Sequence, residues 1–168
     1  MEPLIALIAT TLVVHMIGRT AIPSWRPWPV ALRAGVAVMF TMTGIAHFVG
    51  MRDELIAMVP PALPAPEFLV TLTGILELAA AAALFWRPLR RRAAGGLALM
   101  LLAMFPANVY KAVNETDLRW DDTLLPRTVL QVVFVAAVVA VLAWDLREDR
   151  TADPAIADNA RRSPQQIG

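Results

Sequence analysis

The chain contains no cysteine among its 168 residues. A disulfide, a thiol relay, a CxxC redox pair and a thiolate metal site are therefore excluded. Histidine is nearly as scarce, because only His15 and His47 are present, whereas a zinc site needs about three or four ligands within reach. We therefore predict no metal site.

The N-terminal residues Met1, Glu2 and Pro3 lack the Lys or Arg that opens a secretory signal, so we expect the first apolar segment to be retained.

Apolar residues, by contrast, make up 58% of the chain, and the mean hydropathy is +0.58. A soluble domain of this size does not need so much apolar surface. The charged residues gather in short runs between apolar segments, which is typical of membrane-spanning helices. They form no continuous basic patch, so nucleic acid is not an expected partner. The sequence therefore predicts an all-α integral membrane protein surrounded by membrane lipid.

Four apolar runs approach the length that crosses a bilayer, namely residues 30–50, 67–86, 93–113 and 124–144. We predict that they form a four-helix transmembrane core bundle within residues 30–145. A shorter run at residues 4–17 predicts one extra N-terminal hydrophobic helix, within a segment of residues 1–18, that either spans the membrane or anchors to it. Residues 146–168 are charged and lack apolar periodicity, so we predict a disordered tail there.

The distribution of Lys and Arg predicts the orientation of these runs. Arg90, Arg91 and Arg92 lie at the same end as the basic residues of the C-terminal tail, and this end carries most of the positive charge. By the positive-inside rule it faces the cytoplasm, which predicts a multi-pass protein of the cell inner (plasma) membrane with a cytoplasmic C-terminus. Arg33 lies inside a run but near its inner edge, and we expect its side chain to snorkel to the surface.

Five polar side chains interrupt the outer or middle parts of the runs, and they are the candidate ligand-binding residues. They are His47, Glu77, Asn108, Arg127 and Gln131. An ionisable group near the bilayer centre costs about 2.5–3.5 kcal/mol on insertion scales, so it needs a partner or a function. We predict that the five residues converge on a polar pocket that opens outward below the proline-rich loop of residues 59–66. The pattern assigns no catalytic residue.

Each candidate also has a structural alternative. Glu77 could be a protonated or paired carboxyl that holds helices together, and His47 could be an interhelical hydrogen-bonding group. Asn108 and Gln131 could likewise connect helices, and Arg127 could mark the membrane edge.

Small residues and one proline predict how these helices pack. Gly44 and Gly74 should let neighbouring backbones approach closely. Pro106 should leave the Leu102 carbonyl without its helical partner and kink the helix beside Asn108.

Several short motifs occur in an order that resembles a known family. They are Gly44-Ile-Ala-His47-Phe48, Met58-Val59-Pro60-Pro61-Ala-Leu63-Pro64, Thr73-Gly74-Ile-Leu-Glu77-Leu78, Phe105-Pro106-Ala107-Asn108, and Arg127 with Gln131. Over residues 30–145 the pattern is similar to the DoxX family of bacterial and archaeal inner-membrane proteins. The resemblance implies a compact four-helix membrane core. Some members of that family resemble subunits of a thiosulfate:quinone oxidoreductase, and others are linked to oxidative-stress complexes.

Two functions from different classes are compatible with these observations. The first is a redox-associated subunit that binds a quinone or a similar lipophilic molecule in the outer pocket, with Glu77 accepting or passing a proton. It would need a bound cofactor or a redox partner protein, because the chain has no covalent redox centre. The second is a non-enzymatic membrane scaffold or assembly protein for a soluble partner. A small transporter is a third possibility, and it would have to work as a homo-oligomer.

Overall fold

The computed structural model describes residues 1–114 and 119–152, and the regular secondary structure of these residues is entirely helical. Five helices are long and apolar enough to cross a membrane, which confirms the predicted all-helical class. They are α1 (Glu2–Thr20), α2 (Trp28–Ala46), α4 (Pro66–Ala83), α5 (Arg87–Asn114) and α6 (Leu124–Ala152). The short helix α3 (Arg52–Met58) and two single 3-10 turns, η1 (Pro23–Trp25) and η2 (Trp120–Asp122), lie between them.

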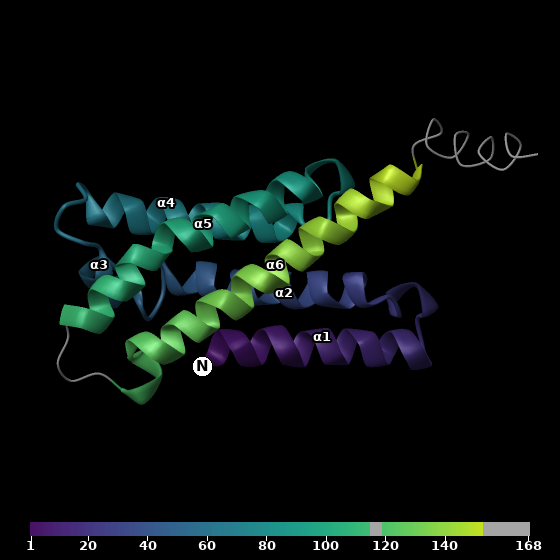
Figure 1. Ribbon diagram of the computed structural model, residues 1–168, viewed down its shortest axis with the longest axis horizontal. Helices are drawn as coiled ribbons and strands as arrows, with labels where there is room; N and C mark the ends of the chain where they lie inside the picture. The colour runs from purple at the N-terminus through teal and green to yellow at the C-terminus, as the bar shows by residue number, and fades with distance from the viewer. Residues whose placement is uncertain (115–118, 153–168) are drawn as a thin grey trace, which may run out of the picture.

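The helix α2 is central to the arrangement. It packs against α1 along its length, against α4, and against α6. The helix α5 packs against both α4 and α6, and α6 crosses the bundle obliquely (Figure 1). The short helix α3 contacts α4 and α5, so it closes the end of the bundle where α2 stops.

The apolar core takes buried side chains from all five long helices. One example from each helix is Leu7, Phe40, Ala81, Leu97 and Val138, and each of them exposes 4% of its surface or less. The structure therefore does not confirm a separate four-helix core, because α1 contributes to the same cluster. α1 joins this cluster because Gly35 of α2 has no side chain where Leu7 and Thr11 of α1 pack. α1 is also 19 residues long rather than the predicted run of 4–17, and its first turn includes Glu2 and Pro3, where an acidic residue and a proline are both favourable.

The last helix is also longer than the apolar run predicts. It continues beyond Asp145 to Ala152, so residues 146–152 of the predicted tail are helical. Asp145 is buried and paired with Arg33 of α2, which holds this end of α6 against the bundle. Residues 153–168, the rest of the predicted tail, lie outside the described residues.

Two glycines set the distance between α2 and α4. A Cβ atom on Gly74 would lie 2.6 Å from the Cβ of His47, and one on Gly44 would lie 2.9 Å from the side chain of Leu78. Contacts this short require a neighbour to move. The predicted close approach of these backbones is therefore confirmed.

Replacing Gly74 with Ala should lower the free energy of unfolding by about 1–3 kcal/mol, because the added methyl group overpacks the α2–α4 contact. Gly95→Ala is the matched control, since no neighbouring atom lies within 4 Å of a Cβ built there. It should be neutral or stabilise the protein by up to about 1 kcal/mol through helix propensity. Thermal unfolding in detergent compares the two variants, and equal midpoints would contradict the close approach.

Candidate functional site

The five predicted site residues occupy two helix contacts. His47 and Glu77 lie where α2 meets α4. Asn108, Arg127 and Gln131 lie where α5 meets α6. The partners of each side chain at these contacts decide what it is free to do.

The carboxyl group of Glu77 lies in the middle of α4, and the residue is 4% exposed. Its Oε2 atom accepts a hydrogen bond from the Thr43 hydroxyl of α2 at 2.6 Å. The same oxygen lies 4.0 Å from Nδ1 of His47. This carboxyl oxygen therefore hydrogen-bonds one polar group of the neighbouring helix and lies near a second, at the position where Gly44 and Gly74 bring the backbones together.

The imidazole of His47 follows the last turn of α2 and is 3% exposed. Its Nδ1 atom lies 2.9 Å from the Thr43 carbonyl oxygen. A carbonyl can only accept, so Nδ1 carries the proton in this contact, and Nε2 is the acceptor of the neutral ring. Beside it, Arg52 of α3 donates to the His47 carbonyl at 3.2 Å and to the Thr71 hydroxyl at 3.1 Å. Arg52 thus connects α3 to the end of α2 and to α4.

The guanidinium group of Arg127 joins the start of α6 to α5. Its Nη1 donates to Oδ1 of Asn108 at 2.8 Å. Its Nη2 and Nε donate to the side chain and the carbonyl of Asp122, at 2.6 Å and 2.8 Å. All three nitrogen atoms are thus engaged within the protein.

One helical turn further along α6, Gln131 makes a second contact with α5. Its amide nitrogen donates to the Leu101 carbonyl at 2.5 Å. Pro106 does lie inside α5, as the sequence shows, but Gln131 bonds the carbonyl next to that of Leu102. Arg127 and Gln131, one helical turn apart, thus join α6 to α5 by two sets of hydrogen bonds.

Sequence reasoning missed an ion cluster of Arg33, Arg90 and Asp145, which we call the ion triad. Nη2 of Arg33 lies 2.8 Å from Oδ1 of Asp145, and Nη1 of Arg90 lies 3.4 Å from the same oxygen. Arg33 is 7% exposed, so the expectation that it snorkels is wrong. The reason is that Asp145 lies at the same end of a neighbouring helix and offers a partner inside the bundle. Opposite charges at the same end of two apolar runs, Arg33 inside one and Asp145 directly after the other, were the signal that could have revealed it.

A second missed contact involves Lys111 of α5, which is 9% exposed. Its Nζ atom lies 3.8 Å from Oε2 of Glu54 in α3. This contact fastens α3 over the end of the bundle.

Two cavities within the described residues are relevant to binding. An apolar groove of about 300 Å³ runs between α1, α2 and α6, with Leu12, Trp28 and Val133 among its lining residues. A polar cavity of about 70 Å³ lies between α5 and α6, lined by Arg87, Arg90, Arg91, Asp145 and Glu148. None of the five predicted site residues lines either cavity. Within residues 1–114 and 119–152, no group of three His, Asp or Glu side chains is placed to hold a metal ion.

Comparison with known families corrects the resemblance drawn from short motifs. Residues 36–143 match a family described as Domain of unknown function (DUF8561), and the DoxX family does not match. The DoxX interpretation is therefore wrong. Its motifs combine small residues, prolines and single polar groups, and such residues recur in unrelated membrane helix bundles. Neither the curated proteins nor the solved structures give a match to this chain.

Proposed function

Because the chain belongs to the DUF8561 family, a domain of unknown function, we propose a function from its geometry. We infer that it is a five-span protein of the cell inner membrane that acts as a non-enzymatic scaffold. Its cytoplasmic end would assemble a soluble partner.

The exposed surface supports the membrane location. Phe68, Phe85, Leu99 and Leu125 each expose between 62% and 75% of their surface, although they belong to or adjoin the five apolar helices. Side chains of this size are unfavourable in water, at about 25 cal/mol for each Å² of apolar surface. A lipid environment removes this penalty.

The tryptophans support the position of the membrane surfaces, and the arginines support the orientation of the chain. Trp25, Trp86 and Trp120 lie between the long helices and are exposed, as expected for an aromatic belt at the membrane surface. The start of α5, which carries Arg90–Arg91–Arg92, and the end of α6 lie at the same end of the bundle (Figure 1). By the positive-inside rule we assign this end to the cytoplasm.

The observation that carries the scaffold role is the use of polar groups between helices. Arg127 directs its three nitrogen atoms to Asn108 and Asp122, and Gln131 bonds a backbone carbonyl. A ligand site needs polar groups that face the ligand instead. Asn108, Arg127 and Gln131 therefore support interhelical connection, the structural alternative that the sequence left open.

A second candidate function, binding of a small lipophilic hydrogen-bonding molecule such as a quinone, is favoured by one observation at the α2–α4 contact. The Thr43 carbonyl takes the Nδ1 proton of His47, which leaves Nε2 as the acceptor of a buried ring whose Nδ1 lies 4.0 Å from the Glu77 carboxyl. Buried ionisable groups in membrane helices are functional candidates by default.

The two candidate functions predict different molecules bound to the purified protein. If the protein is a scaffold, organic extracts of the wild type and of Glu77→Gln should contain the same bulk phospholipids by mass spectrometry. The Glu77→Gln variant should also unfold at a lower temperature, because the carboxylate contact with Thr43 is weakened. A defined lipophile present in the wild type and missing from a folded Glu77→Gln variant would refute the scaffold and support ligand binding.

The absence of cysteine allows a direct test of orientation, because single cysteines can be introduced without background. Leu63 is half exposed in the proline-rich loop, and Arg92 is exposed near the start of α5. In intact cells an impermeant maleimide should label Leu63→Cys, and it should label Arg92→Cys only after permeabilisation. The reverse pattern would overturn the orientation, and labelling of both in intact cells would argue against a membrane-spanning arrangement.

A further inference from the structure

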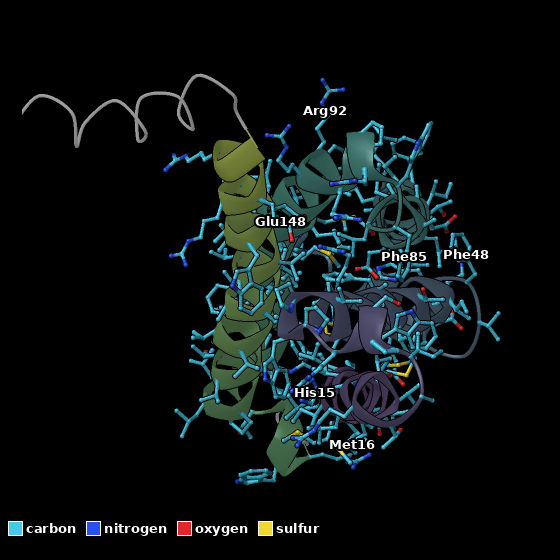
Figure 2. The ribbon with its side chains drawn as sticks, turned by 90° about the vertical axis from the view of Figure 1, so that its right-hand side faces the viewer. His15, Met16, Phe48, Phe85, Arg92 and Glu148 are labelled. Carbon is cyan, nitrogen blue, oxygen red and sulfur yellow. The ribbon has the colours of Figure 1, made fainter. Side chains whose placement is uncertain are left out.

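The polar cavity at the proposed cytoplasmic end is a candidate site that the scaffold role does not use. It lies where α5 begins and α6 ends, and it has a volume of about 70 Å³. Its lining consists of Arg87, Arg90 and Arg91 from α5 together with Asp145 and Glu148 from α6. In Figure 2 the side chain of Glu148 lies between α6 and the neighbouring helices, whereas Arg92 projects from the end of the bundle.

One lining residue contains a buried atom that has no partner. Asp145 is 5% exposed, and its Oδ1 atom faces both Arg33 and Arg90. Its Oδ2 atom is buried without a hydrogen bond, and so is Nε of Arg33. A buried polar atom left unpaired is destabilising, and more so when it is charged. One carboxyl oxygen of this lining residue therefore still has the capacity to accept a hydrogen bond.

The charges around the cavity also call for an anion. Three arginines and two carboxylates line the cavity, which leaves an excess of one positive charge, and Arg33 beside it is paired with Asp145. Guanidinium groups suit phosphate because they donate two parallel hydrogen bonds to it. The cavity thus combines a phosphate-binding side with an acidic side.

The position of the cavity indicates where such a ligand would come from. Phe85 and Trp86 immediately precede α5, and they expose 62% and 63% of their surface. In the proposed membrane orientation these aromatic side chains lie at the level of the lipid headgroups. A headgroup at this cavity would place its acyl chains along the apolar side chains beside it.

We propose that the cavity binds a phosphoethanolamine group, supplied by the headgroup of a phospholipid. Arg87 and Arg91 bind its phosphate. Its primary ammonium donates hydrogen bonds to Asp145 and Glu148. This inference rests on the proposed membrane location.

The test offers the detergent-purified protein equal amounts of phosphatidylethanolamine and phosphatidylcholine and measures retained lipid by native mass spectrometry. Both lipids carry the phosphate, but the quaternary choline nitrogen has no N–H to donate. The wild type should retain phosphatidylethanolamine about tenfold more, the ratio that one charged hydrogen bond supplies. Glu148→Gln should bring the ratio close to equality, and Arg87→Gln should lower retention of both lipids. Arg92→Gln, which removes a charge outside the cavity lining, is the matched control and should behave as wild type.

Three outcomes would overturn the inference. Equal retention of the two lipids by the wild type would show that hydrogen bonds from the ammonium do not contribute to binding. An unchanged ratio in Glu148→Gln would place the binding elsewhere. Free phosphoethanolamine that stabilises the protein as much as the lipid does would identify a soluble ligand instead of a headgroup.

Flotation with vesicles after an alkaline wash separates this inference from the function on which it rests. Protein that fails to float contradicts the proposed membrane location itself. Protein that floats but retains both lipids equally contradicts only the headgroup site.

Discussion

The ion pair between Arg33 and Asp145 is the interaction on which the arrangement of the bundle most depends. It joins the central helix α2 to α6, and Arg90 adds the start of α5 to the same oxygen. A charge transferred from water to an apolar interior costs several kcal/mol unless it is paired. Arg33 therefore depends on Asp145 at this depth, and Asp145 depends on Arg33 together with Arg90. The pair fixes how far α6 extends along α2, and α6 continues as a helix beyond it to Ala152.

The same constraint explains the polar contacts at other levels. Where a helix bundle is surrounded by lipid, the lipid is as apolar as the helices. Apolar packing alone then does little to set the position of one helix along another. Hydrogen bonds between polar groups supply that register, since a shift of one turn would leave a buried donor or acceptor unpaired. Glu77 with Thr43 sets α4 against α2, and Arg127 with Asn108 sets α6 against α5. Both of these hydrogen bonds join residues of two different long helices.

The sequence predicted those features that depend on position along a helix. The apolar runs predicted the long helices, and Gly44 with Gly74 predicted a close approach that the structure confirms. The sequence could not predict which helices are neighbours, because apolar periodicity does not determine how each helix is rotated in the bundle. Arg33 therefore looked like a snorkelling residue, and the polar groups of α4 and α6 looked like parts of one pocket. Tertiary packing gave each of them a nearer partner.

The most direct test of this account is a double-mutant cycle on the ion pair, measured as the free energy of unfolding in detergent. Asp145→Leu leaves the buried Arg33 without its carboxylate and should cost about 3–5 kcal/mol. Arg33→Met should cost less, because Arg90 still lies 3.4 Å from Asp145. The double variant replaces both charges with apolar groups, and it should recover most of that loss. If the two costs simply add in the double variant, the ion pair does not hold α2 and α6 together, and the account is contradicted.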